Sequence, residues 1–195
     1  DLPEALPPMR GWAGSPDFLL IVADQVLNRK PRSVMECSSG VSTVVVARCL
    51  QINGAGHVYS LEHDPNYANQ TRELLNRYGL TSWATVLDAP LQTKYTETPW
   101  YDEDVIPAEL PPIEILIVDG PPAQIAPLAR LPALPRLLPK LAKDIVVILD
   151  DASREDEQNM LISWKSQMSF SLETAFCCEK GCIVLEKKGN FKDQQ

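Results

Sequence analysis

Acidic residues end several short apolar runs of this chain, and acids in such positions can bind or activate a ligand. Glu36 closes the run 33–35 and precedes the small-residue turn 37–40, and Glu62 closes a second run at 58–61. An acid beside a tight loop, followed by an acid at the next strand end, suits a nucleoside, because a carboxylate accepts hydrogen bonds from ribose hydroxyls. The spacing therefore predicts a nucleoside-binding loop between Glu36 and Glu62.

A second group of acids follows two further apolar runs. Asp119 follows residues 113–118, and Asp150 and Asp151 follow residues 145–149. If these runs are neighbouring parallel strands, the three carboxylates converge at one edge of a sheet. Three carboxylates suit Mg²⁺, Mn²⁺ or Ca²⁺, because hard cations prefer oxygen ligands. Alternatively, Asp150 and Asp151 cap the next helix, and Asp119 orients a ligand or acts as a general base.

The elements that would position these acids alternate between strand and helix. Apolar runs between turn residues predict strands at 34–37, 57–62, 83–87, 113–118 and 145–149. Capping and stop signals predict helices at 15–29, 42–51, 65–78 and 153–167, with a proline-interrupted helical pattern at 124–138. A terminal antiparallel hairpin is predicted at 170–176 and 182–187. This alternation predicts an α/β sandwich around a mostly parallel sheet.

Length and composition restrict the class of protein. The 195 residues predict one domain over 1–195, with an irregular arm at 1–14 and a polar tail at 189–195. A net charge of −8 argues against binding to nucleic acid or to an anionic membrane surface. No apolar run reaches the roughly 20 residues that a membrane span needs. The odd count of five cysteines favours a reducing compartment, and a cytoplasmic location is expected.

The connection at 89–112 is long and contains five prolines. Such a connection in a compact domain is usually functional. Trp100 and Tyr101 within it either close over a substrate or pin the connection to the core. Arg130 and Arg154 lie near the same predicted strand ends as the acids, and they are expected to pair with them.

Four short motifs resemble, in family order, the class I S-adenosylmethionine-dependent methyltransferases, and are most similar to a set of bacterial methyltransferase domains. The motifs are Gly-Val-Ser-Thr at 40–43, Leu-Glu-His-Asp at 61–64, Val-Asp-Gly-Pro-Pro at 118–122 and Leu-Asp-Asp-Ala at 149–152. The resemblance implies a three-layer Rossmann-like sandwich with a seven-stranded sheet and a C-terminal antiparallel hairpin. It also implies S-adenosylmethionine as cofactor and methylation of a small-molecule or glycan acceptor, with oxygen as the expected acceptor atom.

The resemblance further implies which residues bind the cofactor. Glu36 to Ser42 resembles the first motif of the family, with Ser38 in place of its first glycine, and Glu62 resembles the acid that holds the ribose. The backbone amides from Ser38 to Val41 are expected to meet the methionine carboxylate. The implied cofactor-binding residues are Glu36, Ser38, Gly40, Ser42, Glu62, His63, Asp88, Ala89 and Asp119.

Metal-dependent O-methyltransferases of the catechol and caffeoyl type are also similar around the second acid group. That similarity implies a divalent cation such as Mg²⁺ on Asp119, Asp150 and Asp151, with Asp119 and Asp150 as catalytic residues. The chain departs from their pattern at two positions. Asp151 stands where those enzymes have asparagine, and Pro122 stands where they place a catalytic lysine.

Two other classes of function remain open from the sequence. One is a binding domain that keeps the nucleoside pocket without transfer chemistry, which Ser38 favours because serine disfavours positive φ. The other is a nicotinamide-dependent oxidoreductase, whose Gly-x-Gly-x-x-Gly fingerprint would fall at Ser38, Gly40 and Thr43, of which only one is glycine. A homo-oligomer is left open.

Overall fold

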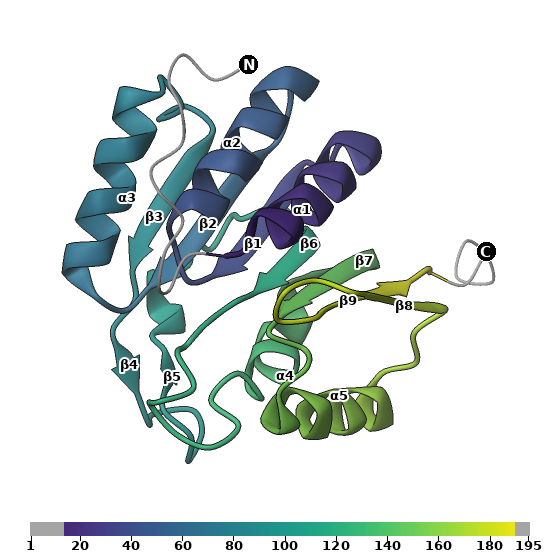
Figure 1. The fold of residues 1–195 in the computed structure, drawn as a ribbon. Coiled ribbons are helices and arrows are strands. Elements are labelled where there is room, and N and C mark those ends of the chain that lie inside the picture. Colours follow the sequence, from purple (N-terminus) through teal and green to yellow (C-terminus); the bar gives the residue numbers. More distant parts are fainter. Residues whose placement is uncertain (1–13, 190–195) are drawn as a thin grey trace.

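A seven-stranded sheet forms the middle layer of the computed structural model, which describes residues 14–189 (Figure 1). The predicted arm at 1–14 and tail at 189–195 lie almost entirely outside the described residues. The strands of the sheet are β1 (Ser33–Cys37), β2 (His57–Glu62), β3 (Ala84–Asp88), β6 (Ile113–Val118), β7 (Leu141–Asp150), β8 (Leu172–Phe176) and β9 (Cys182–Lys187). Their order is β3-β2-β1-β6-β7-β9-β8. The five strands β3, β2, β1, β6 and β7 run parallel to one another, and β9 is antiparallel to both β7 and β8.

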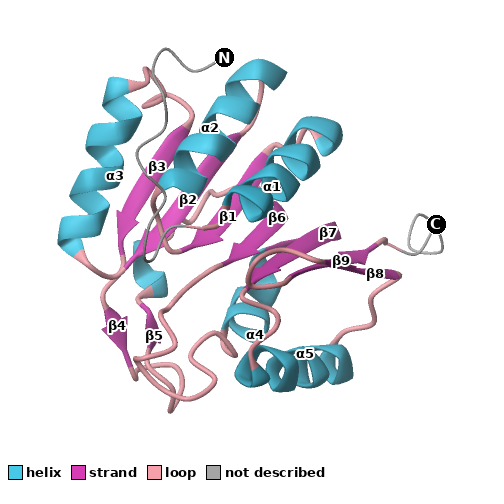
Figure 2. Ribbon diagram, viewed as in Figure 1, coloured by secondary structure: helices cyan, strands magenta, loops and turns pink. Residues whose placement is uncertain are grey.

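Helices cover both faces of the sheet, which gives three layers (Figure 2). One face carries α1 (Pro16–Arg29), α2 (Val41–Asn53) and α3 (Pro65–Arg77), and the other carries α4 (Ala133–Leu137) and α5 (Glu155–Gln167). Each face has its own apolar core. The central strands β1 and β6 contribute alternate residues to the two cores, as strands covered on both faces must. The predicted α/β sandwich with a C-terminal hairpin is confirmed.

Several element boundaries differ from the sequence-based expectation, each for a local reason. Residues 44–46 are valines that favour a strand, yet they lie in α2, because burial against the sheet outweighs their weak propensity. Arg154, not Ser153, is the residue before α5. The helical pattern at 124–138 yields only α4 and a 3₁₀ turn at Leu138–Lys140, since its prolines cannot continue a longer helix.

The long connection contains two short strands that the sequence pattern does not reveal. Strands β4 (Leu91–Gln92) and β5 (Trp100–Tyr101) pair with each other in an antiparallel way, and a 3₁₀ turn at Glu103–Val105 follows. Trp100 and Tyr101 are fully buried, in the core that α4 and α5 cover. This pair therefore pins the connection to the sheet, which is the second of the two predicted roles.

The strand order reverses between β1 and β6, and this reversal determines where the acids after the strands lie. From β1 the chain first builds outward through β2 and β3, and then returns to add β6 and β7 on the other side. Open sheets of this kind bind ligands at the carboxyl ends of the strands flanking the reversal. Val118 pairs with Leu149, so Asp119 and Asp150 follow side by side. Within residues 14–189, no helix is long and apolar enough to cross a membrane.

Candidate functional site

A cavity of about 490 Å³ lies at the carboxyl ends of β1, β2, β6 and β7. Its size falls within the usual range for small-ligand sites. The lining residues come from the turns that follow these strands and from the β8–β9 turn. They include Ser38, Ser39, Glu62, His63, Tyr67, Asp119, Gly120, Arg130, Asp151, Arg154 and Lys180. This is the crevice at which the strand order predicts a ligand.

A larger hollow of about 800 Å³ lies at the opposite edge of the sheet. Arg29 and Glu186 form an ion pair of 2.6 Å there, and Glu114 accepts a hydrogen bond from the backbone amide of Arg32. The parallel strands β6 and β7 border it towards their amino ends, and the antiparallel strand β9 borders it at its carboxyl end, through Glu186 and Lys187. None of the predicted site residues lines it, so the smaller cavity is the candidate site.

The backbone amides of the loop after β1 donate hydrogen bonds to acceptors on β2 and α2. Ser38 donates its backbone N–H to the Leu61 carbonyl, Ser39 to Glu62 Oε2 and Gly40 to Thr43 Oγ1, at 2.9, 3.0 and 3.1 Å. The expectation that the amides of Ser38 to Val41 meet the methionine carboxylate stays a prediction, and three of these amides already have acceptors within the protein. Ser38 has φ +110°, a backbone conformation that favours glycine.

Glu62 lies at the cavity wall with both carboxylate oxygens engaged. Oε2 accepts hydrogen bonds from the N–H and the hydroxyl of Ser39, at 3.0 and 2.9 Å. Oε1 accepts from the Asp64 amide at 3.0 Å and lies 3.0 Å from Nδ1 of His63. Burial alone would raise the pKa of Glu62, but the contacts with His63, Asp64 and Ser39 outweigh it and lower that pKa. The group is therefore a carboxylate at the cavity wall.

Glu36 is fully buried and does not line the cavity. Its Oε2 accepts hydrogen bonds from the hydroxyls of Thr43 and Ser60, at 2.6 and 2.7 Å. Burial raises the pKa of Glu36, against hydrogen bonds from Ser42, Thr43 and Ser60 that lower it. Glu36 therefore ties the first turn of α2 to β2 through these two hydroxyls. This position, outside the cavity lining, differs from the predicted contact with the cofactor.

Asp88 and Ala89, which the sequence analysis names among the cofactor-binding residues, also lie outside the lining of the cavity. The Asp88 side chain is 63% exposed and forms an ion pair of 2.8 Å with Arg72. Ala89 is fully buried and packs in the core that contains Trp100 and Tyr101. The Tyr101 hydroxyl lies against Gly120, at the ends of β1 and β6, and has no hydrogen-bond partner among the described residues. A buried tyrosine thus stands beside the cavity, on the side from which Asp88 and Ala89 were expected to line it.

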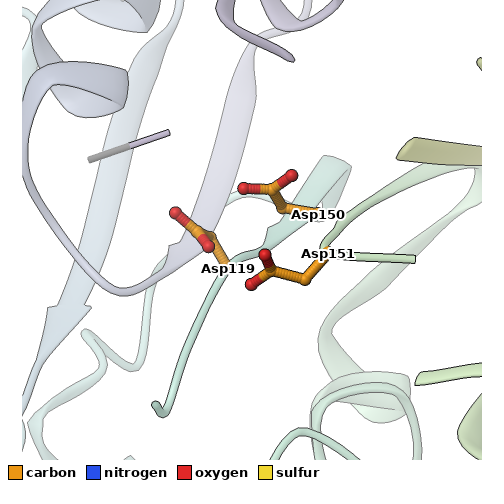
Figure 3. Close-up of side chains that lie close together, drawn as sticks. All are labelled: Asp119, Asp150 and Asp151. Atoms are coloured by element: carbon orange, nitrogen blue, oxygen red, sulfur yellow. The ribbon is translucent and has the colours of Figure 1, made fainter. Parts of the chain in front are cut away.

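Asp119, Asp150 and Asp151 lie together, as the strand order predicts (Figure 3). One carboxylate oxygen of each lies within 4.8 Å of those of the other two. Burial raises the pKa of Asp119 well above its ordinary value, an effect that Arg130 opposes and that Asp150 and Asp151 reinforce. Burial likewise raises the pKa of Asp150. A carboxyl group with a raised pKa suits general-base work near neutral pH.

Arg130 lies among these acids and is only 4% exposed. An arginine has five N–H donors and keeps its charge at all ordinary pH values. Arg130 makes five contacts with the protein. Its Nε donates to the Pro121 carbonyl at 3.3 Å, and its Nη1 donates to the Asp150 carbonyl at 3.1 Å and lies 3.4 Å from Glu157 Oε1. Its Nη2 donates to Asp151 Oδ2 at 2.8 Å and to Asp119 Oδ1 at 3.5 Å. The predicted pairing of Arg130 with the acids is thus present in the structure.

A divalent cation on all three aspartates would lie close to the charge of Arg130. Asp151 already contacts Arg130 through Oδ2 and Arg154 through Oδ1, at 2.8 and 3.0 Å. A cation bound to Oδ2 at about 2.4 Å would lie no more than roughly 5 Å from the Arg130 charge. Asp119 Oδ1 also faces that guanidinium. The predicted metal site stays a prediction, and this geometry does not favour it.

The structure thus brings some of the predicted site residues to the cavity and leaves others away from it. Those that line the cavity are Ser38, Glu62, His63, Asp119 and Asp151. Those outside its lining are Glu36, Gly40, Ser42, Asp88, Ala89 and Asp150.

Lys180 lines the cavity although no sequence pattern indicates a position there. Backbone hydrogen bonds from Ala152 to Gly181 and from Ser153 to Lys180 tie the β8–β9 turn to the turn after β7. The signal that could have found Lys180 is the pairing of Asp150 with Cys182, which sets the turn beside the acids. That pairing is visible only once β9 is known to lie next to β7.

Comparison with known proteins agrees with this fold. The family profile described as "Methyltransferase domain" matches residues 37–152, which span the loop after β1 through the acids after β7. The chain belongs to this methyltransferase-domain family, and its assignment to the class I S-adenosylmethionine-dependent methyltransferases is confirmed. No curated protein sequence matches the chain significantly.

Solved structures with the same fold include several methyltransferases. An O-methyltransferase from Bacillus cereus in complex with SAH has a TM-score of 0.71 at 17% identity, over 92% of this chain and 84% of that one. An O-methyltransferase from Streptomyces achromogenes, involved in tomaymycin synthesis and in complex with SAM, has a TM-score of 0.67 at 12% identity, over 94% and 83%. A methyltransferase from Geobacter sulfurreducens has a TM-score of 0.67 at 16% identity, over 90% and 80%. At these identities the likeness establishes the fold.

Proposed function

We propose that this protein transfers a methyl group from S-adenosylmethionine to an oxygen atom of a small-molecule or glycan acceptor. The observation that carries the proposal is the cavity of about 490 Å³ at the strand-order reversal, with Glu62 on one wall and Asp119 on another. Membership of the methyltransferase-domain family supports it, and so do the SAM and SAH complexes of O-methyltransferases with the same fold.

The residues of this chain have separate tasks in that reaction. When bound, S-adenosylmethionine supplies an activated methyl group on a sulfonium, so the protein mainly has to align the reactants. Glu62 accepts hydrogen bonds from ribose hydroxyls, and His63 lies beside it at the cavity wall. Asp119 orients the acceptor hydroxyl and takes its proton as the oxygen–carbon bond forms and the carbon–sulfur electron pair returns to sulfur.

Isothermal titration with S-adenosylmethionine tests the cofactor assignment. Glu62→Gln should weaken binding at least tenfold, because it loses the charge that holds Ser39, Asp64 and the ribose. Glu114→Gln is the matched control, since it removes a carboxylate contact at the opposite edge of the sheet. Tighter binding of NAD than of S-adenosylmethionine would instead support the oxidoreductase.

Release of S-adenosylhomocysteine over a panel of phenols, sugars and amino compounds tests the transfer. Asp119→Asn should lower kcat more than it changes the Kd for the cofactor, because the amide cannot accept the proton. Transfer to nitrogen alone would contradict the acceptor atom proposed here.

A binding domain without transfer chemistry is the second candidate, and Ser38 favours it. Its φ of +110° puts a side chain where the backbone would otherwise approach a ligand closely. Cofactor binding without S-adenosylhomocysteine release from any acceptor class would select this candidate.

A further inference from the structure

Arg130 has the position and the contacts of a resident counter-ion. Its Nη2 lies between the carboxylates that follow β6 and β7, at 3.5 Å from Asp119 Oδ1 and 2.8 Å from Asp151 Oδ2. Its other donors reach the Pro121 and Asp150 carbonyls, in the same two turns. One side chain therefore joins both turns that carry the acids.

Each carboxylate oxygen of Asp151 has a guanidinium beside it, since Arg154 lies 3.0 Å from Oδ1 as an ion pair, although Oδ1 accepts no hydrogen bond within residues 14–189. A third anion, Glu157 of α5, lies 3.4 Å from Arg130 Nη1 and 3.7 Å from Arg154 Nη1. The guanidinium of Arg130 cannot deprotonate in a protein, so its charge is permanent. Two arginines thus bridge anions that would otherwise repel one another.

We propose that Arg130 takes the place of a divalent metal: it bridges Asp119 to Asp151, positions Asp119 at the cavity, and makes the site independent of metal. The inference rests on the proposed methyl transfer for its functional meaning. Arg130 is a positioning residue, because it acts on the site through the Asp119 and Asp151 carboxylates that it contacts.

Mn²⁺ binding, followed by electron paramagnetic resonance, tests the proposal without turnover. The wild-type protein should show no site with a Kd below about 1 mM. Arg130→Met removes the charge at similar length and should gain Mn²⁺ affinity of at least tenfold. Adding Asp151→Asn to that variant should abolish the gain. Arg29→Met is the matched control, because its ion pair with Glu186 lies at the opposite edge of the sheet.

Arg130→Lys separates charge from mere structural support. Lysine keeps a cation without the planar fork, so this variant should exclude Mn²⁺ as the wild type does. Equal Mn²⁺ affinity in the methionine and lysine variants would overturn the proposal. Submillimolar Mn²⁺ binding by the wild type, lost in Asp119→Asn, would also overturn it, and this measurement holds even if Arg130→Met does not fold.

Titration with S-adenosylmethionine in EDTA keeps the two proposals distinguishable. Wild-type binding that is unchanged by EDTA or by millimolar Mg²⁺ supports a metal-independent site. Binding that requires Mg²⁺ overturns the role of Arg130 and leaves the methyltransferase proposal standing. A wild type that binds no cofactor under either condition overturns the proposed function, while the Mn²⁺ result still decides whether Arg130 is the resident cation.

Discussion

At the scale of the single residue, Ser38 combines a side chain with a backbone geometry that suits glycine. Its φ is +110°, and its Cβ lies 2.9 Å from the position that a Cβ on Gly120 would take. Ser38→Gly should raise the free energy of unfolding by up to about 1 kcal/mol, because relief of strain exceeds the added freedom of the unfolded chain. Urea unfolding measures the change.

Ser39→Gly is the control for that substitution. Ser39 donates two hydrogen bonds to Glu62, and its hydroxyl lies 3.1 Å from the Thr71 hydroxyl. Loss of the hydroxyl contacts should lower stability by about 1 kcal/mol. Equal destabilisation in the two variants would show that Ser38 is not strained.

Glu36 gives a prediction about pH. Burial raises its pKa in the folded protein above the ordinary value of 4.5. Its contribution to stability is therefore complete below about pH 4.5 and is lost as pH rises through the folded-state pKa, at about 1.4 kcal/mol for each unit of difference. Glu36→Gln cannot titrate, so its stability relative to wild type should increase as pH rises.

Urea unfolding of both proteins at several pH values from about 4.5 to 8 measures this trend. Glu73→Gln, on the exposed side of α3, controls for loss of a carboxylate. A constant difference between Glu36→Gln and wild type across that range would contradict a raised pKa for Glu36.

Residue types and spacing predicted that Glu62 and Asp119 lie at the carboxyl edge of the sheet, where both line the cavity. Glu62 and Asp119 follow apolar runs, and a run that becomes a parallel strand carries its final acid to the carboxyl edge. Glu36 stands two residues earlier in the sheet register, at a strand position covered on both faces, and so it is buried. Tyr101 reaches the site only through tertiary packing, which no local pattern encodes.

At the scale of the element, the contact between β5 and the turn after β6 leaves no spare volume. A Cβ added at Gly120 would overlap the Tyr101 hydroxyl and lie 3.2 Å from the Cys37 carbonyl. Gly120→Ala should therefore cost about 1–3 kcal/mol in the free energy of unfolding. A thermal or urea melt measures it.

Tyr101→Phe supplies the matched second variant. The hydroxyl is buried and has no hydrogen-bond partner within residues 14–189, so its removal alone should change stability by less than about 1 kcal/mol. In Gly120→Ala the same change should recover part of the lost stability, and a double-mutant cycle gives the coupling. Strict additivity would mean that the two groups do not touch.

The elements themselves were predictable where a pattern was long and continuous. Strands β2, β6 and β9 and helix α1 match their predicted spans, or nearly so, because apolar runs and proline caps mark them. Strands β4 and β5 have two residues each and depend on their mutual pairing. Strands of two residues are too short to show the alternation of apolar and polar residues that predicts a strand.

At the scale of the whole molecule, the cavity connects both halves of one sheet. Its lining comes from turns after β2 and β1 on one side and after β6 and β7 on the other. A ligand there should stabilise the sheet as a unit, by about 2.7 kcal/mol at a concentration of 100 times Kd.

Differential scanning calorimetry with S-adenosylhomocysteine tests this expectation. One cooperative transition should move to higher temperature, and NAD at the same concentration should leave it unchanged. Two separate transitions, with only one of them shifted, would contradict the single domain predicted for residues 1–195.

The insertion of β9 between β7 and β8 has a consequence for biosynthesis. Lys180 and the β8–β9 turn close the cavity beside Arg154, but they follow every other wall of it in the chain. A ribosome delivers the earlier strands first, so a nascent polypeptide that ends before residue 177 has the turns after β1, β2, β6 and β7 without the wall that the β8–β9 turn supplies. Stalled chains of that length should be captured poorly by immobilised S-adenosylhomocysteine, and release of a few more residues should restore capture.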